Sequence, residues 1–449
     1  MESIEIILQN IEQKNFVAAK EVLSSMNAPD IASFLCDVDS STMLLLFRIL
    51  PKGLAAEVFA FLSPYTQQLI VSSFSDTELS TLLQSLFVDD LADLIEEMPS
   101  NVAGKILKNA TEDTRKIVNQ ILQYPENSTG SILTTEYIKL KKNMSVAEAL
   151  ENIRKQGIKT ETIYTCYITD ENRFLQGVIS LRDLVLADQT HIIGDLMTTD
   201  VISVNTTDDR EIATEIFKKY DFIALPVVDH EKRLVGIITV DDIIDVLEEE
   251  VTEDFQKMAA IEPFDEKYLE TPVLSLAKHR IFWLMFLMLA GTVISGIIEH
   301  FTELLQKCVI LTAFMPIIMD TGGNSGNQAS TLIVRGLGTG DIHTSDFLKV
   351  LWKELRIAVL VASVLSVVMF IKNFILARKD FAVSLTVSCS LVVSIIIAKS
   401  IGSMLPILAK KLKLDPATMA SPMITTVVDI ISLVVFFSFA KIFIPELST

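Results

Sequence analysis

The sequence is poor in the side chains that soft-metal and redox sites use. Its 449 residues include four cysteines and five histidines. The cysteines lie far apart and form no CxxC pair, which argues against a disulfide framework and a thiolate zinc site; they are Cys36, Cys166, Cys308 and Cys389. HExxH, a GxxxxGK(S/T) phosphate loop and a nucleophile elbow are also missing, so an enzyme is the least favoured class of function.

Positive charge is scarce as well. The formal net charge is −19, which argues against a nucleic-acid partner. Up to Lys278 there are 24 Lys+Arg against 47 Asp+Glu, a net −23, and beyond it 14 against 10, a net +4. The first thirty residues lack the uninterrupted apolar core of a secretory signal. We therefore expect an acidic water-soluble part in the cytosol and, after it, a membrane part.

Apolar runs long enough to cross about 30 Å of hydrocarbon fill the sequence after Arg280. They lie near 281–300, 308–334, 355–377, 381–405 and 422–444, which predicts five spans. Lysines and arginines are enriched in the loops on the side of the soluble part. The sequence therefore predicts a multi-pass protein of the cell membrane with a cytoplasmic amino terminus and an extracytoplasmic carboxyl terminus.

The second run, CVILTAFMPIIMDTGGNSGNQASTLIV, is unusually polar for a span. One helix face would carry four oxygen-bearing side chains: Asp320, Asn324, Asn327 and Gln328. Glycines 322, 323 and 326 would allow close helix approach or local unwinding. Two interpretations remain open: a helix interface held by amides, or a permeation path. The second is favoured because an ionisable group at membrane depth usually marks an ion route.

The fifth run places Asp429 near the middle of the bilayer, with Thr425 one helical turn before it. An ion pair with Lys399 of the fourth run is the alternative to a cation site at Asp429. The candidate ligands, Asp320 included, are oxygen donors, which favours a hard ion such as Mg²⁺ or Ca²⁺. A sparse site of one carboxylate per chain suits a largely hydrated Mg²⁺, and a twofold axis would present two copies of Asp429 to one path.

The soluble part begins with short helical segments. Residues 1 to about 125 have turn signals about every twelve residues, which predicts a stacked helical superhelix. Within it, VDDLADLIEEMP places Asp89 and Asp93 on one helix face, where a solvated surface is the plain alternative.

From about 131 to 250 a strand–helix–strand–strand–helix pattern occurs twice. TCYITDENRFLQGVISLRDLVLA aligns with ALPVVDHEKRLVGIITVDDIIDVL. Ser180 and Thr239 are predicted to cap the amino ends of the helices that follow. Asp183 and Asp242 lie three residues after these caps, at the position that completes a capping box. The repeat resembles a tandem pair of CBS domains, in many of which this aspartate holds the ribose of an adenine nucleotide. Asp183 and Asp242 serving only as caps is the alternative.

Directly after the repeat, positions 241–254 hold eight acidic residues and no lysine or arginine. Asp242, Asp245, Glu249 and Glu253 recur at helical spacing. Each close pair of like charges costs about 1 kcal/mol in water and up to about 4 kcal/mol near a protein surface. We expect solvent, salt or bound cations to relieve this repulsion on a helix that connects the repeat to the first span.

Together these features resemble the bacterial MgtE family of magnesium channels, over the whole chain and in order. PIIMDTGGNSGNQ, VDDLADLIEEMP and DPATMASPMITTVVD carry the resemblance, and Ser432 departs from a position where relatives often have glycine. The implied fold class is a multidomain membrane protein with an all-α superhelical amino-terminal domain, an α/β tandem CBS pair, a connecting helix and a five-helix transmembrane domain. The corresponding ranges are 1–128, 129–250, 251–277 and 278–449.

The resemblance also implies a homodimeric Mg²⁺-selective channel that cytosolic Mg²⁺ closes. Asp429 would be the pore carboxylate, and the implied sensor ligands are Glu57, Asp89, Asp93, Glu211, Asp221, Asp242, Asp245, Glu250, Glu253, Asp254 and Asp415. ATP would bind the CBS pair at Arg182, Asp183 and Phe222. The competing hypothesis is a nucleotide-sensing membrane regulator without transport, which would bind ATP and give no ion flux.

Overall fold

The computed structural model describes residues 2–264, 268–269, 271–419 and 421–444. The chain divides into two compact units, Met1–Leu247 and Glu248–Thr449, with the division inside helix α15.

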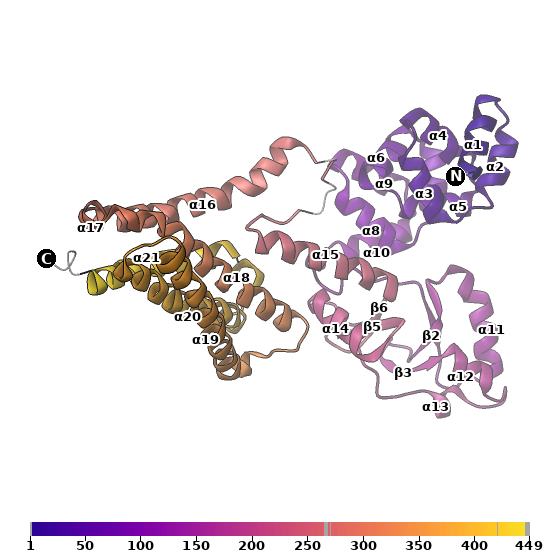
Figure 1. Cartoon of the computed structure of the whole chain (residues 1–449). Coiled ribbons are helices and arrows are strands. Elements are labelled where there is room, and N and C mark those ends of the chain that lie inside the picture. The colour runs from indigo at the N-terminus through magenta and orange to yellow at the C-terminus, as the bar shows by residue number, and fades with distance from the viewer. Residues whose placement is uncertain (1, 265–267, 270, 420, 445–449) are drawn as a thin grey trace. The chain divides into compact units, whose positions relative to one another are not determined.

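The amino-terminal part of the first unit is a stack of short helices (Figure 1). Local signals explain the boundaries: Ser75 and Glu78 form a capping box at α7, and Pro64 occupies the first turn of α6. Buried side chains such as Phe47 and Phe59 join neighbouring helices in one core. The predicted superhelix is confirmed. The helices are α1 (Glu2–Glu12), α2 (Phe16–Leu23), α3 (Ala28–Cys36), α4 (Ser40–Ile49), α5 (Lys52–Ala60), α6 (Pro64–Ser73), α7 (Asp76–Leu83), α8 (Val88–Glu97), α9 (Ser100–Asn109) and α10 (Glu112–Ile121).

Two three-stranded sheets follow, as the repeat predicts. In each, the first two strands run parallel and the third is antiparallel, in the orders β1-β2-β3 and β4-β5-β6. The first repeat comprises β1 (Tyr137–Leu140), α11 (Val146–Gln156), β2 (Thr162–Thr169), β3 (Leu175–Ser180) and α12 (Leu181–Leu186). The second comprises α13 (Ile193–Leu196), β4 (Val204–Asn205), α14 (Arg210–Tyr220), β5 (Ala224–Val228), β6 (Leu234–Thr239) and α15 (Val240–Met258).

The second unit is dominated by long apolar helices, in which α18, α20 and α21 pack on one another and α19 packs on α20 (Figure 1). Its helices are α16 (Val273–His300), α17 (Thr302–Lys307), α18 (Met315–Gly338), α19 (Phe347–Ile371), α20 (Phe381–Lys411) and α21 (Ser421–Phe443). Among the described residues, four stretches are long and apolar enough to cross a membrane: Val273–His300, Thr344–Leu376, Phe381–Lys411 and Ala417–Phe443. Helix α18 is too polar to join them, so the count of five spans stays a prediction.

Three segment ends differ from the sequence prediction. The run 308–334 is α-helical only from Met315, because Val309–Ala313 form a 3₁₀ turn and Pro316 fits the first helical turn. Only residues 251–258 of the predicted connecting segment 251–277 lie in the acidic helix α15, which starts at Val240 and ends at Met258; α16 already begins at Val273. Past that end Ala260 adopts a φ of 55°, which an α-helix does not accommodate, and residues 265–267 and 270 lie outside the described chain.

Candidate functional site

Helix α18 meets α20 through two glycines. A Cβ added to Gly402 would lie 2.2 Å from the carbonyl oxygen of Gly326. A Cβ added to Gly326 would lie 2.8 Å from the Cγ2 of Ile424 and 3.2 Å from the carbonyl oxygen of Ala398. Backbone therefore packs directly on backbone, which is the use of small residues at membrane helix crossings.

The same side of α18 also packs on α21. A Cβ on Gly322 would come within 2.9 Å of the Ser432 hydroxyl, and one on Gly323 within 3.0 Å of the Cγ2 of Thr425. Asn327 Nδ2 donates a hydrogen bond of 3.2 Å to Thr425 Oγ1. The amide and the glycines thus hold α18 against the helix that carries Asp429.

The remaining polar side chains of α18 point elsewhere. Asp320, Asn324 and Gln328 are exposed in the single chain, whereas Asn327 is half-buried. The predicted four-residue face is therefore divided: Asn327 turns to α21 and the other three form an outer seam. We call Asp320, Asn324 and Gln328 the polar seam of α18.

Asp429 of α21 is half-buried, and within the described residues its buried Oδ1 has no hydrogen-bond partner. The carboxylate of Asp320 is close enough for the two like charges to interact. Two carboxylates that repel each other, one with an unused buried oxygen, form an arrangement that a cation stabilises.

The alternative partner of Asp429, Lys399, is engaged elsewhere. Lys399 Nζ lies 3.9 Å from Glu354 Oε2 of α19, and both side chains are buried. The ion pair considered between Lys399 and Asp429 is therefore replaced by a pair between α19 and α20.

Acidic side chains gather a second time in the first unit, where α8 meets the start of α15. Asp89 is 7% exposed, and its Oδ1 has no hydrogen-bond partner among the residues described. Burial raises the pKa of Asp89 well above its usual value, and the charge of Asp242 adds to the shift. Asp93 reaches solvent, yet the surrounding protein and the charge of Asp242 raise its pKa to about 8. Burial likewise raises the pKa of Asp242 to about 6, although hydrogen bonds donated by Thr239 oppose the rise.

Three further carboxylates of this cluster escape the sequence prediction: Asp90, Glu136 and Glu161. Burial raises the pKa of Asp90 to about 6 and that of Glu161 to about 8, with neighbouring carboxylates adding to both. Glu136 Oε2 accepts the backbone N–H of Val88 at 3.2 Å, at the start of α8, where the helix dipole favours an anion. Glu136 and Glu161 precede strands singly, so no periodic pattern singles them out. We call Asp89, Asp90, Asp93, Glu136, Glu161 and Asp242 the α8 acid cluster.

A third acidic group lies at the end of α15, in the second unit. Glu253 and Asp415 both form ion pairs with Lys257, and Lys257 Nζ lies 2.7 Å from Asp415 Oδ2. Burial raises the pKa of Asp254 to about 6, and the charges of Asp415 and Glu250 add to the rise while Lys257 opposes it. Glu250 and Asp254 therefore belong with this group.

The other predicted sensor residues are dispersed over the first unit. Glu57 on α5, Glu211 on α14, Asp221 at the end of α14 and Asp245 on α15 are exposed. In the described part of the chain, no three His, Cys, Asp or Glu side chains are arranged closely enough to hold a metal ion. One chain therefore brings carboxylates near one another without completing a coordination shell.

The predicted nucleotide residues occupy exposed or half-exposed positions. Ser180 caps α12 by accepting the Asp183 N–H at 3.1 Å, and its hydroxyl donates to Asp183 Oδ2 at 2.7 Å. Arg182 and Asp183 are exposed, whereas Phe222 is partly buried and stacks on Tyr220.

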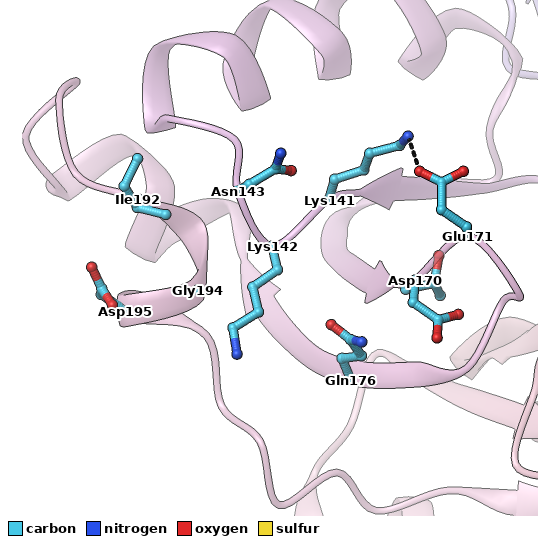
Figure 2. A pocket seen from close by; sticks show the side chains of 10 residues that line it. Lys141, Lys142, Asn143, Asp170, Glu171, Gln176, Ile192, Gly194 and Asp195 are labelled. Carbon is cyan, nitrogen blue, oxygen red and sulfur yellow. Dashed lines mark hydrogen bonds and ion pairs between the residues drawn. The ribbon is translucent and has the colours of Figure 1, made fainter.

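A hollow of about 470 Å³ lies elsewhere, between the first CBS repeat and α13 (Figure 2). Lys141, Lys142, Asp170 and Asp195 are among its lining residues, and Lys141 Nζ lies 2.7 Å from Glu171 Oε1. Among the described residues that line it, Arg182, Asp183 and Phe222 do not appear. Its lining carries both lysines and carboxylates, so charges of both signs face the hollow.

Fold and site define a multidomain membrane protein in which two repeated α/β domains precede a bundle of long apolar helices that holds buried carboxylates, and comparison with known proteins specifies the class further. Residues 315–439 match the MgtE family described as "Divalent cation transporter", residues 26–127 the MgtE intracellular N domain, and residues 130–189 and 193–249 the CBS domain. The chain is 34% identical to the magnesium transporter MgtE of Thermus thermophilus over 98% of both chains. It is 30% identical to the Bacillus subtilis magnesium transporter MgtE over 93% of this chain and 95% of the relative.

Two solved structures resemble the soluble part. One is the cytosolic domain of the Mg²⁺ channel MgtE in complex with ATP, at 33% identity and a TM-score of 0.52 over 54% of this chain and 99% of the other. The second is the soluble part of a magnesium transporter, at 28% identity and a TM-score of 0.53 over 56% and 98%. The chain belongs to the MgtE family of magnesium transporters. The relatives are named as transporters and not as enzymes, which confirms the expectation from the sequence.

Proposed function

We propose that this chain carries Mg²⁺ across the cell membrane as a homodimeric channel that cytosolic Mg²⁺ closes. The observation that carries the proposal is the unpartnered buried oxygen of Asp429 beside the charge of Asp320. Mg²⁺ sheds water reluctantly and is usually held by one or two carboxylates with waters between. A sparse set of carboxylate and amide oxygens therefore suits a hydrated Mg²⁺ in transit.

The polar seam of α18 supports the dimer. A charged aspartate is costly inside a span, by up to about 2.5 to 3.5 kcal/mol at the centre on insertion scales, so Asp320 in the second turn of α18 needs protein or water rather than lipid beside it. A second copy would cover the seam and present a second Asp429 to the same path. The amino terminus would be cytosolic and the carboxyl terminus extracytoplasmic, as the lysine and arginine distribution predicts.

The two acidic groups outside the membrane helices support control by Mg²⁺. Without a cation, repulsion within the α8 acid cluster and at the end of α15 favours separation of the helices that carry the carboxylates. Bound Mg²⁺ would reverse the repulsion and favour the closed arrangement, and by linkage closure would raise the affinity for Mg²⁺. The chain would thus limit uptake once cytosolic Mg²⁺ is sufficient.

ATP is the proposed second ligand. The ATP complex of a related cytosolic domain, together with Arg182, Asp183 and Phe222, supports a nucleotide site in the CBS pair. Calorimetry on the full-length protein should show ATP binding that Asp183→Asn weakens at least about tenfold, since the ribose loses a charged acceptor. Equal heats for both proteins would contradict this assignment.

Ion flux into liposomes tests the transport half. We expect Asp429→Ala to abolish Mg²⁺ flux, because a hydrated dication loses its carboxylate at membrane depth. Asp341→Ala, on the exposed loop after α18, is the matched control and should transport normally. Normal flux through the Asp429 variant would refute the pore role, and ATP binding without any flux would favour the nucleotide-sensing regulator.

Closure of the channel by cytosolic Mg²⁺ is tested with a separate variant. Asp89→Asn combined with Asp93→Asn replaces two carboxylates of the α8 acid cluster, which Mg²⁺ would otherwise hold deprotonated, with neutral amides and should raise the Mg²⁺ concentration that halves the flux. Asp113→Asn, exposed in the first turn of α10, removes a charge outside the cluster and should leave that concentration unchanged. Identical responses of all three proteins would count against the sensor role.

A further inference from the structure

The end of α15 carries one positive charge among carboxylates. The eight acidic residues at 241–254 have no lysine or arginine among them, and Lys257 follows three positions after the last of them. Its ammonium group binds Glu253 on the same helix and lies 2.7 Å from Asp415 Oδ2. The two side chains are 21% and 34% exposed, so water only partly screens the pair between Lys257 and Asp415.

Asp415 in turn organises the start of α21. Its Oδ1 accepts the backbone N–H of Ala417 at 2.8 Å, and its carbonyl oxygen accepts the hydroxyl of Thr418 at 2.8 Å. These bonds begin the 3₁₀ turn Ala417–Met419 that precedes α21. One carboxylate therefore serves two purposes: one oxygen shapes the entry to the helix that carries Asp429, and the other receives Lys257.

The geometry around Lys257 is fixed from the other side as well. Gln256 Nε2 donates to the carbonyl of Phe264 at 3.0 Å, and the Phe264 N–H donates to Gln256 Oε1 at 2.8 Å. This pair of bonds anchors the turn after α15. Burial lowers the pKa of Lys257, but the hydrogen bonds that its ammonium group donates to Asp415 and Glu253 outweigh burial and raise the pKa above its usual value. The lysine therefore stays charged throughout the physiological pH range.

We propose that Lys257 is a positioning residue: a tethered counter-charge that holds the end of α15 on Asp415 and so lowers the Mg²⁺ concentration needed for closure. The inference rests on the proposed closure by Mg²⁺. It makes Lys257 one of the groups that determine the Mg²⁺ concentration at which the channel closes. Without Lys257, Asp415 would face Glu253 and Asp254 with no fixed positive charge between them, and Mg²⁺ alone would have to offset the repulsion.

Flux measurements in liposomes test the proposal with full-length Lys257→Gln. The Mg²⁺ concentration that halves the flux should rise roughly two- to fivefold, the range that a partly exposed ion pair supports. Lys257→Arg should stay within twofold of the wild type because it keeps the charge. Lys413→Gln removes an exposed charge two residues before Asp415 and should have no effect. On an Asp415→Asn background, Lys257→Gln should add little, because its partner is already gone.

Hydrogen exchange without Mg²⁺ gives a readout independent of flux. Peptides that cover residues 412–419 should exchange faster in Lys257→Gln than in the wild type or Lys413→Gln, because Asp415 loses the contact that holds it. A lower half-closing concentration would mean that Lys257 competes with Mg²⁺ for Asp415, and it overturns the proposal, as does unchanged closure with unchanged exchange. Wild-type flux that ignores cytosolic Mg²⁺ would overturn the proposed closure itself, and this inference with it.

Discussion

Asp89 and Glu161 each bury a carboxylate oxygen for which the described residues supply no hydrogen-bond donor. An unpaired buried charge is costly, so such a group either takes a proton or recruits a cation. A proton and a cation would neutralise the same carboxylate oxygens, so the two compete for them. Proton binding to the α8 acid cluster and Mg²⁺ binding to it should oppose each other.

This competition predicts a pH-dependent stability. The folded-state pKa values of about 6 for Asp90 and Asp242 and about 8 for Asp93 and Glu161 lie above the usual carboxyl values. The folded chain therefore holds protons that the unfolded chain has lost, and its stability falls as pH rises from about 4 through 6 and 8. In EDTA the full-length protein should melt at least about 3 °C lower at pH 8.5 than at pH 5.5.

Two controls identify which groups make the melting temperature fall with rising pH. Saturating Mg²⁺ should flatten this dependence, because the cation replaces the protons. Asp93→Asn with Glu161→Gln should also flatten it in EDTA, since the two groups that titrate highest are gone. A melting temperature in EDTA that rises between pH 5.5 and 8.5 would contradict the prediction.

Residue-level prediction from the sequence succeeds where a pattern exists and fails where packing creates the neighbourhood. Asp89 and Asp93 are four apart on one helix, so their shared face is visible in the sequence. Glu136 and Glu161 are separated by 25 positions and precede different strands; the backbone bond from Glu161 N–H to the Glu136 carbonyl, 2.8 Å long, brings them together. No spacing rule predicts such a pair.

At the scale of elements, the crossing of α18 and α20 leaves no room for a side chain. We expect Gly402→Ala to lower the melting temperature in detergent by several degrees and to reduce Mg²⁺ flux, because its methyl group would overlap the carbonyl oxygen of Gly326. Gly291→Ala in α16 is the matched control, since a Cβ there meets nothing within 4 Å. Equal melting temperatures for the two variants would contradict the crossing.

The ion pair between α19 and α20 makes a different prediction. Glu354→Gln or Lys399→Met alone leaves one buried charge without its partner, a defect worth roughly 3–5 kcal/mol in buried pairs. The double variant removes both charges and should recover most of the lost melting temperature. If the double variant instead loses the sum of the two single losses, the two side chains do not act as a pair.

Helix existence is easier to predict than helix ends in this chain. Apolar length identifies α16, α19, α20 and α21, and the twelve-residue turn period indicates the stack α1–α10. The true start of α18 depends on how Pro316 fits a first turn, and the end of α15 depends on the reversal at Ala260. Both are local backbone features that hydropathy does not report.

At the scale of the whole molecule, the charge is divided unevenly: a net −23 up to Lys278 and +4 beyond it. The acidic part repels itself more strongly as ionic strength falls, because screening weakens. Divalent ions should relieve that repulsion at far lower concentration than monovalent salt. Fold class and family are readable from the sequence because each part has its own pattern. The polar face of α18 is also visible in its helical spacing, but the sequence does not show that Asn327 turns to α21 while Asp320, Asn324 and Gln328 stay uncovered in one chain.

The uncovered seam predicts the assembly. Native mass spectrometry of the detergent-solubilised protein should give a mass of two copies, because one chain leaves the polar side chains Asp320, Asn324 and Gln328 exposed on a helix of the apolar bundle. Gln328→Leu should leave the dimer intact, whereas Asp320→Lys, which places two like positive charges near the axis, should shift it towards single chains. A single-copy mass for the wild type would contradict the dimer.

The contact of Gly326 with Gly402 finally has a genetic consequence. Every glycine codon begins with GG, and each single-base change that alters the amino acid inserts a larger side chain. No single-base change that replaces either glycine therefore preserves the contact, and a saturating screen for growth on scarce magnesium should recover almost no substitutions there. Gly291 and Gly296, with open space around them, should by contrast accept alanine and serine freely.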